Sequence, residues 1–358
     1  MVGKVIVSTM RDNITNKNIL FLCSRFFGYE VKITEMLYKL GAKSVYYKEC
    51  NFFKESFRDH ISFYTLKKFL KNPKYRDNWS EEFWNEISEK KFDTFFVMEN
   101  LSFSKWFISR LKSNNPNLRS ILFLWDKFST QQPRYFDYLP LFDKVYTFDK
   151  DDAKRYNISY FPDFYIEYPH NEVNGYQYDV VFIGTLHNGT TEFRGEVLKR
   201  IEQECKRKGL NSFIWLYNSK YSESKRWYIR WFRNHIRQDS FKKALDSCKG
   251  CGFLHDVPLS LEEYYKIIKN SKAVIDINHR NRQGMTLNVI EAIASGKKLI
   301  TTNTRIKDEP FYDSNMILVI DEDNPIIDRS FLDAPSKIVD ISECRLDNWL
   351  KHVLNEEN

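Results

Sequence analysis

The chain has 358 residues, of which 42% are hydrophobic and 16% aromatic, and its 55 basic and 48 acidic residues give a formal net charge of +7. This length suits two domains of ordinary size, and the composition excludes an intrinsically disordered chain. The modest, scattered positive charge argues against a nucleic-acid-binding protein and fits an anionic substrate or an acidic lipid surface.

In the first half of the chain, apolar strand-like runs alternate with helical patterns, for example over Tyr29–Leu40 and Ser80–Lys90. Such near-continuous apolar strands indicate a parallel sheet that is covered by helices on both faces. A sheet of this kind binds its ligands at the carboxyl ends of its strands. The predicted strands are Asn18–Cys23, Ser44–Tyr47, Thr94–Met98, Ser120–Trp125 and Lys144–Phe148.

A stretch rich in turn formers, residues 164–177, interrupts this pattern and is predicted to be a linker. The alternation then restarts, and an amphipathic helix over Glu343–Leu354 closes the chain. We therefore predict an α/β protein with domains at residues 1–168 and 178–335, followed by a C-terminal segment at 336–358. The predicted strands of the second domain are Asp179–Ile183, Ser212–Leu216, Gly252–Leu254, Ala273–Ile277, Lys298–Thr302 and Met316–Ile320.

The most informative segment runs from Gln283 to Ile300 and indicates a glycine turn, a short amphipathic helix and a buried strand. Free N–H groups at a helix start, together with the positive end of the helix dipole, attract phosphate. Glu291 lies a little over one turn into this helix, where its carboxylate could accept hydrogen bonds from ribose hydroxyls. The alternative is an ordinary βαβ unit with a surface glutamate.

Three further residues of the second domain are candidate phosphate ligands. Gly184 and Thr185 end its first strand, where a glycine lets the backbone approach a diphosphate and a threonine can donate to it. Arg194 lies on the next helix and could pair with phosphate oxygens. Gly284 adds a second glycine turn after another strand of the same predicted sheet.

The loop at residues 278–284 is dense in hydrogen-bond donors. Arg280 and Arg282 are candidate clamps for a leaving diphosphate, because fixed cations stabilise the charge that develops on it. A solvated basic loop is the alternative. The loop precedes a helix N-terminus, which favours the first interpretation.

Acidic residues that follow strands of the first domain are candidates for a general base. An enzyme that activates a substrate hydroxyl needs a carboxylate or histidine near that hydroxyl as general base. The candidates, in order, are Glu30, Asp126 and Glu99, and a helix cap or a surface group is the alternative for each.

Two short motifs are weak signals for a metal. Cys248 and Cys251 form a lone CxxC, which without further ligands indicates reduced thiols near a strand more than zinc. Asp149 and Asp151 form a DxD, but Asp149 also suits the start of a helix. We expect neither a metal nor a cofactor.

Residues 225–237 combine basic and aromatic side chains. A basic helix that carries tryptophans suits an anionic membrane surface. The alternative is a helix packed on the second domain with solvated arginines. The arginines that share one helical face are Arg226, Arg230, Arg233 and Arg237.

No apolar run approaches the roughly 20 residues that span a bilayer, and Met1 to Val7 lack the layout of a signal peptide. We therefore expect a cytoplasmic protein, either unattached or peripheral on the inner face of the cytoplasmic membrane.

The run Glu291-Ala292-Ile293-Ala294-Ser295-Gly296 resembles the second half of the donor-site motif of GT-B glycosyltransferases. In that motif two glutamates separated by seven residues precede Ala-x-Ala-x-Gly and a buried strand. Here Gln283 stands in place of the first glutamate. More loosely, residues 18–320 are similar to the CgeB-like bacterial polysaccharide and spore-coat glycosyltransferases, most clearly at residues 178–185 and 276–303.

This resemblance implies the GT-B fold, with two Rossmann-like parallel-sheet domains facing a central cleft. Residues 1–168 would bind the acceptor and residues 178–335 the nucleotide-sugar donor, and the C-terminal helix would cross back onto the first domain. It places Glu291 on the ribose, Gln283 at the donor sugar and the loop around Val257 at the base. The diphosphate would lie on the turn formed by Gly284, Met285, Thr286 and Leu287.

The implied function is metal-independent transfer of a sugar from a nucleotide-sugar donor to a bacterial surface glycan or lipid-linked saccharide, such as capsule, O-antigen or lipopolysaccharide. Two alternatives stay open within the same fold. One is a nucleotide-sugar epimerase. The other is a non-catalytic protein that binds sugar nucleotides, an option that the glutamine at position 283 keeps open.

Overall fold

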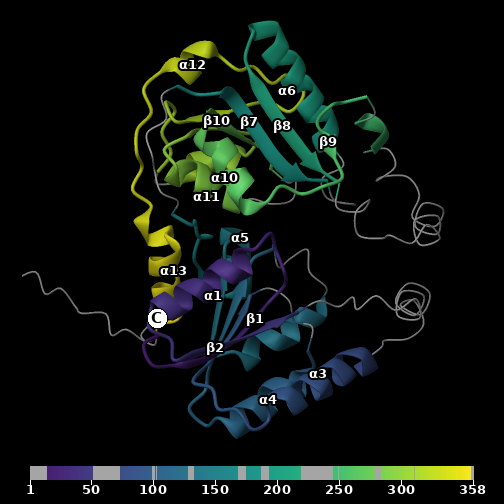
Figure 1. The fold of residues 1–358 in the computed structure, drawn as a ribbon, viewed down its shortest axis with the longest axis vertical. Helices are drawn as coiled ribbons and strands as arrows, with labels where there is room; N and C mark the ends of the chain where they lie inside the picture. The colour runs from purple at the N-terminus through teal and green to yellow at the C-terminus, as the bar shows by residue number, and fades with distance from the viewer. Residues whose placement is uncertain are drawn as a thin grey trace, which may run out of the picture. The chain divides into compact units, whose positions relative to one another are not determined.

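The computed structural model describes residues 14–50, 73–98, 101, 103–127, 133–167, 175–186, 193–218, 245–248, 250–278, 284–309 and 311–355. The chain forms two compact units (Figure 1). Unit 1 comprises Met1–Pro162 and Arg345–Asn358, and unit 2 comprises Asp163–Cys344. The C-terminal helix therefore belongs to the same unit as the N-terminal part of the chain.

Unit 1 is built on a six-stranded parallel sheet with the order β2-β1-β3-β4-β5-β6. The order reverses between β1 and β3, because β1 pairs with β2 on one side and with β3 on the other. The strands are β1 (Asn18–Cys23), β2 (Ser44–Glu49), β3 (Thr94–Met98), β4 (Arg119–Leu124), β5 (Lys144–Thr147) and β6 (Ser159–Tyr160).

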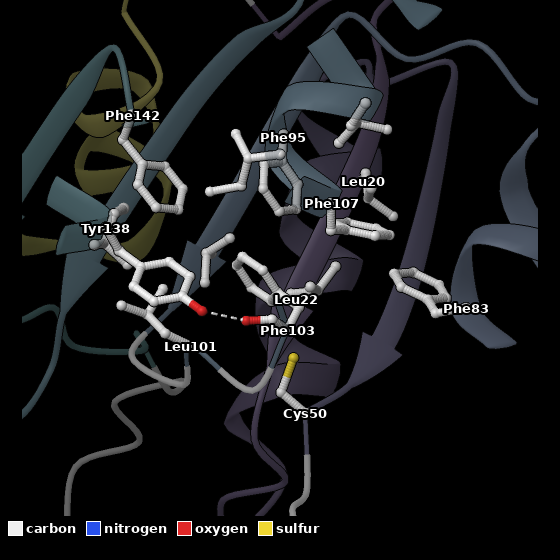
Figure 2. Close-up of a cluster of buried hydrophobic side chains, with 14 of the residues drawn as sticks. Leu20, Leu22, Cys50, Phe83, Phe95, Leu101, Phe103, Phe107, Tyr138 and Phe142 are labelled. Carbon is white, nitrogen blue, oxygen red and sulfur yellow. Dashed lines mark hydrogen bonds between the residues drawn. The ribbon is translucent and has the colours of Figure 1, made fainter. Parts of the chain in front are cut away.

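Helices cover both faces of this sheet. On one face, α3 (Pro73–Ile87), α4 (Lys105–Asn114) and the 3-10 helix η2 (Pro133–Leu141) enclose a cluster rich in phenylalanine (Figure 2). In that cluster the hydroxyl of Tyr138 donates to the carbonyl of Phe103 over 2.6 Å. The pairing satisfies a buried carbonyl, and the same hydroxyl accepts from Nη1 of Arg76 over 3.2 Å.

On the other face lie α1 (Tyr29–Lys39) and α13 (Leu346–Val353) (Figure 1). Trp349 of α13 is fully buried, with its ring centroid 4.7 Å from that of Phe123, and its indole N–H donates to the carbonyl of Pro162 over 2.9 Å. The guanidinium of Arg119 donates to the carbonyl of Leu354, just after the helix, over 3.0 Å. These contacts fix α13 as part of the core of unit 1. The short helix α5 (Lys150–Tyr156) follows β5.

Unit 2 is built on a second six-stranded parallel sheet, with the order β12-β11-β10-β7-β8-β9. Counted within the unit this is 6-5-4-1-2-3, the strand order of dinucleotide-binding Rossmann folds. The strands are β7 (Tyr178–Thr185), β8 (Ser212–Tyr217), β9 (Leu254–His255), β10 (Ser271–Asp276), β11 (Lys298–Thr301) and β12 (Ile317–Val319).

Helix α6 (Arg194–Lys208) packs on one face of this sheet, and α10 (Leu261–Lys269) and α11 (Leu287–Ala294) pack on the other (Figure 1). Alternate residues of β7 serve the two sides, since Val180 and Phe182 contact the α6 layer while Val181 contacts the α10 and α11 layer. This alternation follows from the period of two in a strand. The remaining short elements are η3 (Thr304–Asp308), α12 (Arg329–Asp333) and η4 (Ser342–Cys344).

The predicted fold class is confirmed, because the chain is α/β with two Rossmann-like parallel sheets. Several predicted boundaries were wrong, and one short strand was missed. Helix α3 begins at Pro73 and not at Ser80, since proline is well suited to the first helical position. Strand β9 covers only Leu254–His255 and not Gly252–Leu254, and the two-residue strand β6 was not predicted.

Candidate functional site

The candidate site lies at the carboxyl edge of the unit 2 sheet, where the strand order reverses between β7 and β10. Connections from these two neighbouring strands lead to helices on opposite faces of the sheet, and open α/β sheets bind their ligands at such a point. The elements that meet there are the ends of β7 and β10, the start of α6 and the start of α11.

Arg194 ties the two sides of this switch point together. It is the first residue of α6, and its Nε and Nη2 donate to the carbonyl of Ile277, just past β10, over 3.2 and 3.0 Å. Its Nη1 donates to the carbonyl of Thr185 at the end of β7 over 3.0 Å. The guanidinium therefore holds the backbone at the switch point, and its predicted pairing with phosphate stays a prediction.

Gly184 has a packing role in the structure. A Cβ on this residue would lie 2.7 Å from Cζ of Phe182, whose ring is buried in the α6 layer. Interior packing leaves little room for such an atom. The absence of a side chain at position 184 therefore accommodates Phe182, whether or not a diphosphate approaches the same backbone.

The first turn of α11 has no side-chain cap. The N-cap residue Thr286 is of a type that usually caps a helix, but its hydroxyl donates to Oδ1 of Asp276 over 3.2 Å. Asp276 is 4% exposed and also accepts from the hydroxyl of Thr301 over 2.8 Å. Because the first N–H groups of a helix lack intrahelical partners, this arrangement leaves the N–H groups at the predicted diphosphate turn without a side-chain cap.

Opposing effects act on the pKa of the Asp276 carboxyl. Burial raises the pKa of its carboxyl, while the hydroxyls of Thr301 and Thr286 and the charge of Arg194 lower it. The net effect is a pKa above the usual value of an aspartate. The carboxyl of Asp276 holds the hydroxyl of Thr286 beside the helix start.

Gly284, Met285 and Leu287 are buried, and the side chains of Met285 and Leu287 are 5% and 8% exposed. Met285 packs in the layer beneath α10 and α11. Any contact of these residues with a diphosphate would therefore use backbone N–H groups and not side chains.

Glu291 is 2% exposed, so the alternative of a surface glutamate is excluded. The hydroxyl of Tyr265, on the neighbouring helix α10, donates to its Oε1. The adjacent Tyr264 lies in the electric field of this carboxylate. Burial first, and then the negative charge of Glu291, raise the pKa of Tyr264 well above its usual value.

Helix α10 begins with the capping box that the spacing of Ser260 and Glu263 predicts, with the serine hydroxyl accepting from Glu263 N over 3.2 Å and the glutamate accepting from Ser260 N over 2.8 Å. Val257, the predicted base-loop residue, precedes this box and is 67% exposed. Its carbonyl accepts from the indole N–H of Trp215 over 3.2 Å.

In unit 1, the candidate base Glu30 is 5% exposed, and its Oε2 accepts from the backbone N–H of Phe26 over 3.1 Å. It therefore braces the loop before α1, where Phe27 and Gly28 have φ values of 51° and 91°. Asp126 follows β4 and is partly exposed. A role in proton transfer stays a prediction for both acids.

Several predicted residues lie outside the part of the chain that the structure describes. They are Glu99, Arg280, Arg282, Gln283 and the basic segment 225–237. Within the described residues, no group of three or more histidine, cysteine, aspartate or glutamate side chains could hold a metal ion.

Asp149 of the DxD sequence is the N-cap of α5, as predicted, and accepts from the N–H groups of Asp151 and Asp152 over 3.0 Å each. Cys248 and Cys251 are free thiols, and burial raises the pKa of each. Across the described ranges, no helix is both long enough and apolar enough to cross a bilayer.

Two of the residues at this site were not predicted. Asp276 ends a buried strand, and an acid at that position was a signal that sequence reasoning did not use. Tyr265 gives no such signal, because its contact with Glu291 joins two helices and depends on how both pack on the sheet.

Comparison with solved structures identifies the architecture. The chain is similar to an alpha,alpha-trehalose-phosphate synthase (UDP-forming) from Burkholderia vietnamiensis, with a TM-score of 0.51, 10% identity and 96% of each chain covered. A UDP-GlcNAc 2-epimerase from Methanocaldococcus jannaschii matches with a TM-score of 0.48 and 11% identity, over 94% of this chain and 98% of that one.

The fold is therefore of the GT-B type, which the resemblance at residues 291–296 implied. No family model matches the sequence, and no curated protein matches it.

Proposed function

We propose that this protein is a GT-B glycosyltransferase that moves a sugar from a nucleotide-sugar donor to a bacterial surface glycan or lipid-linked saccharide. The acceptor classes are capsule, O-antigen and lipopolysaccharide. One observation carries the proposal: the buried carboxylate of Glu291 lies on a helix whose first turn has no side-chain cap, at the switch point of a Rossmann sheet. The fold likeness to a UDP-forming synthase supports it.

In this proposal the donor diphosphate binds the first N–H groups of α11. The helix dipole and these donors stabilise the negative charge that develops on the leaving group. Arg280 and Arg282 add fixed positive charge from the preceding loop, so the reaction needs no metal. Arg194 braces the backbone around the diphosphate and is also a candidate to pair with its oxygens, and Asp276 holds Thr286 in place.

The nucleoside and the sugar occupy positions on either side of the diphosphate. Glu291 accepts hydrogen bonds from the ribose hydroxyls, the backbone near Val257 holds the base, and Gln283 faces the transferred sugar. Glu30 and Asp126 are the candidates for a general base. Attachment to an anionic membrane through residues 225–237 belongs to the same proposal, because it would bring the enzyme to a lipid-linked acceptor.

A thermal-shift screen identifies the donor. The protein is melted with UDP, GDP, TDP, CMP and their sugars, and a ligand that binds only the native state raises the melting temperature with its concentration. We expect one base to give a clear shift. An assay of that nucleotide sugar with an acceptor extract then separates transfer from the alternatives. An epimerase turns over donor without acceptor, and a non-catalytic binding protein leaves the donor intact.

Replacement of Glu291 tests the binding site directly. Hydrogen bonds to a charged group contribute roughly 1.5–3 kcal/mol each, so Glu291→Ala should weaken nucleotide binding by at least about tenfold in calorimetry. The control is Cys251→Ala, a partly exposed thiol for which we expect unchanged affinity. Unchanged nucleotide affinity in Glu291→Ala would remove the assignment of the ribose site.

A further inference from the structure

The carboxylate of Glu291 receives a hydrogen bond from a helix that the donor-site motif does not include. The hydroxyl of Tyr265 on α10 donates to Oε1, and both side chains are buried, at 9% exposure for Tyr265 and 2% for Glu291. Hydrogen bonds to an ionised acceptor are stronger than neutral ones, and a low local dielectric strengthens them further. The orientation of this carboxylate is therefore set by α10.

A second contact between the same two helices fixes the start of α11. Asn288, in its first turn, accepts from the hydroxyl of Tyr264 over 3.5 Å and donates through Nδ2 to the carbonyl of Ile183 over 3.2 Å. Ile183 lies near the carboxyl end of β7, the strand that forms one side of the switch point. The tyrosine pair thus links α10 to the first turn of α11 and to its carboxylate.

We propose that Tyr265 is a positioning residue for ribose recognition, which makes the protein selective for ribonucleotides over nucleotides that lack the ribose hydroxyls. This inference rests on the proposed function, in which Glu291 binds the ribose. A carboxylate offers about four acceptor positions. The tyrosine hydroxyl fixes the plane of the group, so that the carboxylate meets a cis-diol in one orientation.

The physical reason for selectivity is preorganisation. A carboxylate that is free to rotate loses side-chain entropy when it binds a ligand. Tyr265 restricts that rotation before the nucleotide arrives. Loss of the hydroxyl should therefore weaken only those ligands that use the carboxylate.

The test compares two ligands on four forms of the full chain. UDP and 2′,3′-dideoxy-UDP, or the matching pair for the base that the thermal-shift screen selects, are titrated by calorimetry into the wild type, Tyr265→Phe, Glu291→Gln and Tyr178→Phe. Tyr178 packs in the same buried layer as Tyr265. The control therefore removes a tyrosine hydroxyl from this layer without removing the one that donates to Glu291.

In the wild type we expect the ribonucleotide to bind at least about tenfold more tightly than its dideoxy counterpart. In Tyr265→Phe this preference should fall by roughly tenfold, with little change for the dideoxy ligand. Tyr178→Phe should keep the wild-type preference. A purely structural tyrosine would weaken both ligands equally, and that result would overturn the inference.

Failure of the inference differs from failure of the proposed function. If Glu291→Gln loses the ribose preference while Tyr265→Phe keeps it, Glu291 binds ribose without help from Tyr265 and the inference is wrong. If Glu291→Gln keeps the preference for the ribonucleotide, Glu291 does not bind the ribose, and both the ribose assignment and the inference are wrong.

Should Tyr265→Phe not melt cooperatively, a crystal structure of the wild type with the nucleotide decides. Tyr265 and the ribose on the same carboxylate would support the inference. Glu291 turned away from Tyr265 would overturn it.

Discussion

Two carboxylates, Asp276 and Glu291, are buried near the reversal of strand order in unit 2. Removal of a charged group from water is costly unless hydrogen bonds or opposite charges replace the lost hydration. The carboxyl of Asp276 accepts from two threonine hydroxyls and lies in the electric field of Arg194. The carboxylate of Glu291 accepts from the hydroxyl of Tyr265. A core that required only packing would place apolar residues at these positions. Their presence is therefore consistent with a binding role at this edge.

Gly184 is expected to tolerate no side chain. In Gly184→Ala the new methyl group would collide with the buried ring of Phe182, and such overpacking costs typically 1–3 kcal/mol. Urea denaturation should show this loss. The matched control is Gly252→Ala, since a Cβ at Gly252 would have no neighbour within 4 Å. Gly209→Ala does not serve as a control, because Gly209 has a φ of 63° and a side chain there would strain the backbone. Equal stability of Gly184→Ala and the wild type would show that Phe182 can move aside.

For single residues, the sequence predicted which residues lie at the site more accurately than it predicted the role of each residue. Glu291 was chosen for its place in a helix after a glycine turn, and its burial beneath α10 could not be read from that local pattern. The pairing of Arg194 with phosphate stays a prediction, and the sequence did not show that its guanidinium also donates to the carbonyls of Thr185 and Ile277. The carbonyls that an arginine reaches depend on tertiary contacts between strands.

At the scale of elements, the edge strand β9 is held by ring stacking. His255 stacks on Trp215 of β8, with ring centroids 3.5 Å apart and an angle of 8° between the planes. Burial lowers the pKa of His255 from 6.5, although Asp256 opposes this shift. The neutral imidazole is therefore the form that the folded protein favours.

This shift predicts a loss of stability in mild acid. Because the pKa of His255 is lower in the folded state than in the unfolded state, its contribution is present above about pH 6.5 and is lost as the pH falls through the folded value. The urea midpoint of the wild type should therefore drop more between pH 7.5 and pH 5 than that of His255→Phe, which keeps a stacked ring but cannot titrate. Equal drops in the two proteins would contradict the prediction.

Long, strongly apolar elements were predicted well and short ones poorly. Asn18–Cys23 and Thr94–Met98 match the structure, because each is a continuous apolar run between polar turns. Strands β6 and β9 have two residues each, and only pairing with a neighbouring strand defines them. Strands this short show no periodic pattern of apolar residues, so they could not be recognised in the sequence.

At the scale of the whole molecule, each unit has its own sheet and its own buried layers on both faces. The last helix completes unit 1, although unit 2 separates it in sequence from the rest of that unit. Stability of unit 1 therefore depends on residues at the far end of the chain, whereas the candidate nucleotide site draws only on residues of unit 2.

The substitution Trp349→Ala should lower the stability of unit 1 without changing nucleotide binding by unit 2. The indole is fully buried against Phe96 and Phe123, and truncation of a core tryptophan costs about 3–5 kcal/mol. Denaturation followed by circular dichroism should show an early transition from unit 1. Below that transition, calorimetry should give unchanged nucleotide affinity. A loss of affinity while unit 1 is still folded would contradict a binding site built from unit 2 alone.

A crystal structure with a bound nucleoside diphosphate tests the donor site directly. We expect the diphosphate to accept hydrogen bonds from the backbone N–H groups of Leu287 and Asn288, with the ribose on Glu291. A nucleotide bound at any other place, with the start of α11 unoccupied, would contradict this expectation.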